Sequence, residues 1–185
     1  MRRCHTLLAL VPVLVIAACA PASSPGGPAP DRILAVDADG RVIRRSTSDE
    51  KARASFAAPL DKVWPALVMS YAELGIDPTV VDRALGRYGN NSFAAPRRFA
   101  GRPLGVFFNC GSGLTGPYID AGRLTANVVT LVQAAPDGTT RATTYASGTL
   151  QRNEGASTDP IVCSSTGALE EVLRGGIERR LAASR

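Results

Sequence analysis

Histidine is almost absent from this sequence. The one histidine, His5, lies near the N-terminus, in a segment that we expect to be removed from the mature protein. Without histidine, neither serine–histidine–aspartate nor cysteine–histidine catalysis can operate, and no histidine-ligated zinc site can form. The other residues offer no credible catalytic constellation. We therefore expect a protein that is not an enzyme and that holds no cofactor and no metal.

Aromatic residues are also sparse, at 5 % of the chain, so the core must consist mainly of Val, Leu, Ile and Ala. A length of 185 residues with 45 % hydrophobic content suits one globular domain. The net charge of +5 falls to +3 without Arg2 and Arg3, because 19 basic residues then face 16 acidic ones. A nucleic-acid partner usually needs a more concentrated basic face. The densest basic stretch, Arg97, Arg98 and Arg102, is interpreted as a solvated loop rather than an anion site.

The N-terminus has the features of an export signal. Two arginines precede an apolar run of 12 residues, 7–18, which is shorter than the roughly 20 residues that a membrane-spanning helix needs. The run ends in Ile16-Ala17-Ala18-Cys19, which resembles the lipobox of bacterial lipoproteins: an aliphatic residue, two small residues and a cysteine. The resemblance implies cleavage before Cys19 and attachment of lipid to its sulfur.

Two other interpretations of this segment remain open. Ala18-Cys19-Ala20 fits the A-x-A pattern of an ordinary signal-peptide cleavage site, although Pro21 follows at once and is unfavourable there. Alternatively, Cys19 could be a buried cysteine of a core helix, but the Pro/Ser/Gly-rich residues that come next disfavour a helix.

Residues 20–30, APASSPGGPAP, are too small and polar to form a core, and they predict a flexible tether. The chain is thus divided into a signal peptide (1–18), a lipidated cysteine with its tether (19–31) and a globular domain (32–185). Ala20 stands where an Asp would resemble the signal for inner-membrane retention. Because Ala20 replaces that Asp, the sequence implies the outer membrane, if the organism has two membranes.

Hydrophobic periodicity predicts an α+β domain. Helices are expected at 60–75, with an apolar stripe of Val63, Leu67, Tyr71 and Leu74, and at 166–183. Strands are expected at 33–36 and 42–45 around an Asp-Gly turn, and at 51–57, 79–82, 86–93, 123–134 and 139–150; the pattern at 102–109 fits a short helix or a strand. The prediction is a single domain in which an antiparallel sheet of four to six strands packs against two main helices on one face.

The last predicted helix contains an unfavourable pair, Gly175-Gly176, which costs roughly 1 kcal/mol per glycine relative to alanine. Close packing against the sheet would explain it. Ser164, Ser165 or Thr166 is expected to cap the start of this helix.

Cys110 and Cys163 are the cysteines of the predicted globular domain, and in an oxidising compartment two such cysteines usually pair. A bridge between them would close a loop of about 54 residues and contribute roughly 4 kcal/mol in the chain-entropy model. The alternative is a reactive thiol, with Cys163 at a helix N-terminus as the better thiolate.

Two further patterns carry little chemical information. Residues 111–116, GSGLTG, match G-x-G-x-x-G, but the phosphate-binding form opens a helix, whereas Pro117 follows here. We interpret them as a flexible loop beside the disulfide. The aspartates lie mostly at predicted turns and element ends, where they serve as caps, and nothing selects a catalytic pair from among Asp61, Asp77, Asp82, Asp120, Asp137 and Asp159.

Residues 57–93 contain LDKVWPALVMSYAELGIDPTVVDRALGRY, in which a helix opening with Val-Trp leads to Leu-Gly and then to two strands. This arrangement resembles the repeated domain of the BamC (NlpB-type) lipoproteins, which attach to the outer-membrane β-barrel assembly machinery. The resemblance implies an α+β domain with helices on an antiparallel sheet. This chain departs from the family by its single domain, its short tether and its cysteine pair, so no functional residue and no barrel-assembly role carries over.

The sequence as a whole predicts a lipid-anchored protein of the cell envelope that acts as a non-catalytic interaction or accessory module. Its membrane contact is the N-terminal lipid, its partner is an envelope protein of unknown identity, and nucleic acid is not expected. The second face of the sheet or the loop at 110–118 would be the contact surface. A small-ligand or lipid carrier is the alternative function, and an enzyme that uses a thiol or paired carboxylates is a third.

Overall fold

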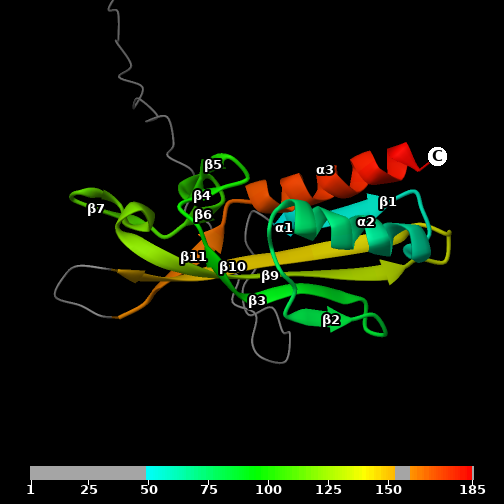
Figure 1. The fold of residues 1–185 in the computed structure, drawn as a ribbon, viewed down its shortest axis with the longest axis horizontal. Helices are drawn as coiled ribbons and strands as arrows, with labels where there is room; N and C mark the ends of the chain where they lie inside the picture. The colour runs from blue at the N-terminus through cyan, green and yellow to red at the C-terminus, as the bar shows by residue number, and fades with distance from the viewer. Residues whose placement is uncertain (1–48, 153–158, 185) are drawn as a thin grey trace, which may run out of the picture.

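The computed structural model describes residues 49–152 and 159–184. The hairpin expected at 33–36 and 42–45, the tether and Cys19 lie outside these residues. Within them the chain forms an α+β domain in which helices cover one face of an antiparallel sheet (Figure 1). None of the helices in these two segments is long and apolar enough to cross a membrane.

The main sheet contains seven antiparallel strands, in the order β2-β3-β9-β10-β11-β6, with β1 paired to β10 beside this path. The strands are β1 (Arg53–Phe56), β2 (Val80–Asp82), β3 (Arg87–Ala95), β6 (Phe108–Asn109), β9 (Gly122–Ala134), β10 (Thr140–Arg152) and β11 (Ile161–Ser165). Two small hairpins are separate from it: β4 (Arg98–Phe99) with β5 (Arg102–Pro103), and β7 (Ser112–Gly113) with β8 (Gly116–Pro117).

The β9–β10 hairpin is the centre of the sheet, and it confirms the two long strands predicted from the sequence. Its ladder runs from Thr140 opposite Ala134 to Arg152 opposite Gly122. Side chains alternate between buried and more exposed along both strands, as expected for a sheet covered on one face. The buried positions lie on one face: Leu124, Ala126, Val128 and Val132 on β9, and Ala142, Thr144, Ala146, Gly148 and Leu150 on β10.

Two short strands share the other edge of β10. Strand β1 pairs with residues 140–143, and β11 pairs with residues 147–150. The two strands therefore lie one after the other along the same edge, although more than a hundred residues separate them in the sequence.

Helix α2 (Leu60–Glu73) confirms the helix predicted at 60–75. Its buried stripe includes Val63, Leu67 and Tyr71, and Gly75 adopts a φ of 67° just after the helix, as a terminating glycine does. Trp64 packs edge-on against Tyr88 of β3, with ring centroids 5.9 Å apart, so this tryptophan belongs to the core.

Helix α3 (Ala168–Ala183) lies beside α2 on the same face of the sheet (Figure 1). A Cβ on Gly176 would stand 2.9 Å from Ser70 Oγ of α2, whereas a Cβ on Gly175 would meet only the Arg179 side chain, at 3.6 Å. The close packing expected of this glycine pair thus involves one glycine, and it is against a helix and not the sheet. Arg180 adds contacts across the same seam, donating to Glu73 Oε2 at 2.7 Å and to the Met69 carbonyl at 3.3 Å.

Several details differ from the sequence-based expectations. The sheet has one strand more than the upper expectation of six because the two-residue strand β6 extends it next to β11. The segment 102–109 combines both of its alternatives, with β5, the 3-10 helix η1 (Leu104–Val106) and β6 in succession. The segment expected as a strand at 51–57 begins with a short helix, α1 (Asp49–Ala52), before β1.

The start of α3 also differs from the prediction. The N-cap residue of α3 is Gly167, whose φ of 85° favours glycine. Glycine also fits because the Lys51 side chain occupies the space where a Cβ would stand. The hydroxyls act one step earlier: Thr166 Oγ1 accepts from the Ala168 N–H at 3.3 Å, and Ser165 Oγ accepts from the Gly167 N–H at 3.0 Å. Ser165 and Thr166 therefore stabilise the turn that precedes the helix.

Candidate functional site

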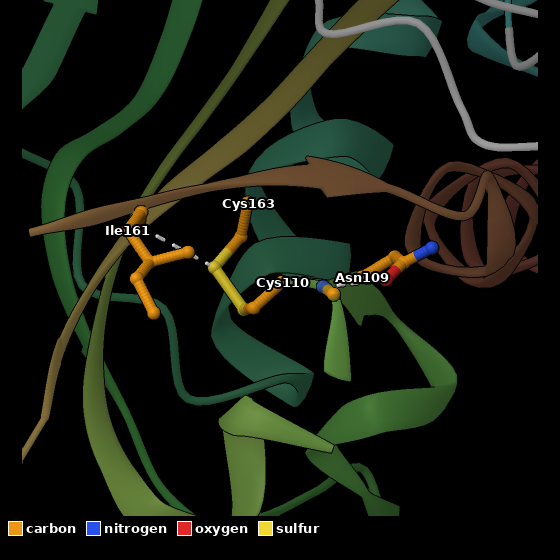
Figure 2. Close-up of a disulfide and its surroundings, with 5 residues drawn as sticks. Asn109, Cys110, Ile161 and Cys163 are labelled. Carbon is orange, nitrogen blue, oxygen red and sulfur yellow. Dashed lines mark hydrogen bonds between the residues drawn. A yellow bond between two sulfur atoms is a disulfide. The ribbon is translucent and has the colours of Figure 1, made fainter. Parts of the chain in front are cut away.

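The structure joins Cys110 and Cys163 in a disulfide, as the sequence predicts (Figure 2). Cys163 lies in β11, and Cys110 directly follows β6, the neighbouring strand of the sheet. The two Cα atoms are 4.2 Å apart, and both residues are buried in the core. A bonded and buried pair leaves neither sulfur available as a nucleophilic thiolate.

The surroundings of the bridge are tightly packed. The Cys163 sulfur lies 3.7 Å from the Ile161 carbonyl oxygen (Figure 2); since a disulfide sulfur carries no proton, we regard this as a packing contact. Asn109 Oδ1 accepts from the Gly111 N–H at 2.9 Å and so shapes the exit of the chain from the bridge. The disulfide consequently holds the root of the loop at 110–118.

That loop forms the β7–β8 hairpin, which projects at the end of the molecule away from the C-terminus (Figure 1). Tyr118 folds back on its base: its N–H donates to the Gly111 carbonyl at 3.1 Å, and its ring lies where a Cβ on Gly113 would be. At the tip, Leu114 is fully exposed (109 %). The loop interpretation of GSGLTG is thus refined to a hairpin, and Gly116 lies in a strand and not in a helix.

The hairpin β4–β5 carries the basic stretch. Its turn consists of Ala100 and Gly101, both with positive φ, as a tight two-residue hairpin turn requires. Arg98 donates to the Gly101 carbonyl at 2.6 Å, and the Arg102 guanidinium lies 5.6 Å from the centre of the buried Phe107 ring. The arginines therefore stand on a folded hairpin attached to the core.

A fourth arginine lies at the same end of the sheet. Ala95, at the end of β3, pairs with Leu124 of β9, so Arg97 and Arg123 continue the two neighbouring strands past this pair. We use the term basic end for Arg97, Arg98, Arg102 and Arg123 together with the β7–β8 hairpin. Two acids belong to the same end: Asp120, in the 3-10 helix η2 (Tyr118–Ala121) that leads into β9, and Asp159, which precedes β11 where Ile161 pairs with Leu150.

The second predicted contact surface is the sheet face turned away from α2 and α3. On it, Val129 stands opposite Tyr145, and Leu131 stands opposite Thr143. These side chains are only partly buried, whereas their neighbours on the other face are fully buried. Among the described elements, no helix covers this face (Figure 1). We call these four residues the open sheet face.

Glu170 is a site that sequence reasoning missed. It lies in the first turn of α3, only 3 % of it is accessible, and it accepts from Ser165 Oγ at 2.8 Å. Burial raises the pKa of this carboxyl, and Ser165 opposes the shift by hydrogen bonding. Its neighbour Glu171 faces outward and pairs with Lys51 at 3.1 Å. The first turn of α3 therefore holds one buried and one exposed acid.

The described residues contain no group of three or more side chains placed to hold a metal ion. Glu170 is the one buried carboxyl among them, and the six aspartates singled out in the sequence are not buried. The structure thus defines a disulfide-bonded α+β domain with two candidate contact surfaces, the basic end and the open sheet face. The chain matches no protein-family model, and no curated protein and no solved structure shows significant similarity to it.

Proposed function

We propose that this chain is a membrane-anchored lipoprotein of the bacterial envelope and that it acts as a non-catalytic interaction module. The observation that carries the proposal is the sequence Ile16-Ala17-Ala18-Cys19 at the end of a short apolar segment that follows two arginines. The Cys110–Cys163 disulfide supports it, because such bonds persist in oxidising compartments outside the cytoplasm. In a two-membrane organism, Ala20 favours the outer membrane, and the proposal places the domain on its periplasmic side.

The open sheet face is the surface that we propose for an envelope protein partner. Val129, Leu131 and Tyr145 present a mixed apolar and polar surface on a rigid sheet, which is the composition of a non-obligate interface. The resemblance of residues 57–93 to the BamC-type domain is compatible with such an accessory role, and it supplies no partner residue.

The proposal is tested by the intact mass of the protein extracted from membranes in detergent. A mature chain that begins at Cys19 and carries diacylglycerol is expected. Cys19→Ser should abolish processing and lipidation, whereas Cys4→Ser is the matched control, because its cysteine lies in the removed segment. An unmodified N-terminus, or a processed Cys19→Ser chain, would refute the anchor.

The interaction role is tested by placing a photo-crosslinking residue at Tyr145 on the open sheet face and, as a control, at the exposed Met69 of α2. A discrete crosslinked protein that appears in cells from position 145 and not from position 69 is expected. Equal or absent crosslinking at both positions would argue against this face.

A further inference from the structure

We infer that the basic end rests on an anionic lipid bilayer, with Leu114 inserted among the headgroups and the four arginines bound to lipid phosphates. The inference relies on the proposed function only for the nearness of a membrane. It assigns to this surface a partner that the anchor alone does not imply.

Basic residues outnumber acidic ones in the segment that forms the basic end. Residues 96–123 carry four arginines and a single acid, Asp120. Within the described segments, the salt bridges all involve residues of α1, α2 and α3: Lys51–Glu171, Arg174–Glu178, Arg179–Glu73 and Arg180–Glu73. Lys51, Arg174, Arg179 and Arg180 thus lie beside carboxylates, whereas Arg97, Arg98, Arg102 and Arg123 form no salt bridge with any described residue.

The apolar tip lies on the same end. A single exposed leucine is ordinary on a protein surface, but Leu114 stands at the apex of a projecting hairpin whose root is held by a buried disulfide. The disulfide therefore fixes the root of this projection. The Tyr118 ring packs against Gly111 and Gly113 at its base.

The combination selects the kind of partner. A bilayer offers phosphates to guanidinium groups and an apolar layer beneath them, so it can satisfy the arginines and Leu114 together. An acidic protein segment would match the charge, but it would give Leu114 no apolar environment of its own. Arginine also suits this contact because its planar fork binds phosphate with two hydrogen bonds.

The test uses the full chain reconstituted into vesicles of phosphatidylcholine, with or without an equal part of phosphatidylglycerol. Tryptophan is introduced as Leu114→Trp and, as the control, as Met69→Trp on α2; the native Trp64 is buried and provides a constant background. On anionic vesicles, the tryptophan at 114 should show blue-shifted emission and quenching by brominated lipid, and the tryptophan at 69 should show neither. High salt should reverse the effect, since the Debye length falls from about 10 Å at 0.1 M to about 3 Å at 1 M.

Charge variants decide whether the arginines are responsible. In the Leu114→Trp background, R97Q/R98Q/R102Q is expected to lower the quenching to the level of position 69. Because Arg98 and Arg102 also contact the β4–β5 hairpin and Phe107, the variant R97Q/R123Q provides a second test with fewer structural contacts at stake. The matched control R53Q/R87Q/R141Q removes the same charge near the β9–β10 turn, at the other end of the sheet, and should retain the quenching.

Water-like emission at position 114 on anionic vesicles would overturn the inference, as would quenching that persists in both basic-end variants or is lost equally in the control variant. The intact mass of the same samples separates this outcome from the proposed function. Lipid on Cys19 without contact at 114 refutes the inference alone, and contact at 114 without lipid on Cys19 refutes the anchor alone.

Discussion

The phenolic oxygen of Tyr71 lies 2.8 Å from Thr130 Oγ1, inside the apolar core between α2 and the sheet. Thr130 Oγ1 in turn lies 2.8 Å from Thr144 Oγ1, so three buried hydroxyls link α2 to β9 and β10. Burial raises the pKa of Tyr71 well above its ordinary value, and the phenol stays protonated at any physiological pH. A polar link of this kind fixes where the helix sits on the sheet, because sliding would strand hydroxyl groups in an apolar environment.

Two substitutions in this chain of hydroxyls should differ in cost. Tyr71→Phe removes the terminal hydroxyl of this hydrogen-bonded row and leaves Thr130 bonded to Thr144. We therefore expect a loss of about 1 kcal/mol in the free energy of unfolding. Thr130→Val removes the shared partner of two buried hydroxyls, and we expect a loss of about 2–3 kcal/mol. Urea unfolding measures the free energy of unfolding of both variants. A smaller loss for Thr130→Val than for Tyr71→Phe would show that the three hydroxyls do not stabilise the domain together.

The glycine pair of α3 offers a matched comparison at adjacent positions. Gly175→Ala should stabilise the domain by about 0.5–1 kcal/mol, because alanine favours the helix and its Cβ meets no crowding. Gly176→Ala should destabilise it, because the new Cβ would stand 3.2 Å from Ser70 Cβ and push α2 and α3 apart. Thermal unfolding of the two variants gives the sign directly. If both variants gained stability, the close approach of the helices at Gly176 would be disproved.

The disulfide should matter for stability more than for the arrangement of the strands. The double variant Cys110→Ala/Cys163→Ala is expected to lose about 3–4 kcal/mol, since the bridge spans 53 residues of sequence. Reductant should weaken the wild-type domain by a similar amount and leave the double variant unchanged. An effect of reductant on the double variant would mean that the measured loss has another origin.

Glu170 should make the stability depend on pH in the opposite sense to a salt-bridged acid. Its pKa is raised in the folded state, so the folded protein binds the proton more tightly than the unfolded chain does. The stabilisation from this proton is therefore complete at pH values below the ordinary carboxyl pKa of 4.5. It is lost as the pH rises from there through the raised pKa of Glu170 in the folded state. Glu170→Gln keeps the size of the side chain and an acceptor for Ser165, and it should remove this loss.

The measurement is urea unfolding at pH 4 and pH 7. Relative to wild type, Glu170→Gln should be more stabilising at pH 7 than at pH 4. Glu171→Gln is the control, since this exposed acid pairs with Lys51 at the surface and such pairs contribute little. A pH dependence of Glu170→Gln equal to that of wild type would contradict the assignment.

The elements predicted correctly from the sequence are those whose own residues carry the signal. The stripe of Val63, Leu67 and Tyr71 predicts α2, and the alternation on either side of Pro136-Asp137-Gly138 predicts β9 and β10. The cysteine pair was predictable for a chemical reason, because two cysteines in an exported domain rarely remain free.

The features that were missed depend on contacts between distant segments. Glu170 looks like an ordinary acid in the first turn of a helix, and only the approach of Ser165 and the packing of α3 on the sheet bury it. Strand β6 has two residues and exists because β11 offers a free edge, and the β4–β5 turn uses Ala100-Gly101, which is a weaker turn signal than Asp-Gly. No local pattern could locate these features.

The pairing of β1 and β11 with the same edge of β10 has a mechanical consequence. A force applied to the chain on the N-terminal side of α1 acts first on the four residue pairs between β1 and β10. Further along the same edge, β11 is held both by its own ladder and by the covalent bond to Cys110. Under load, the domain should thus yield first at β1, while the part of the sheet next to the disulfide keeps its shape.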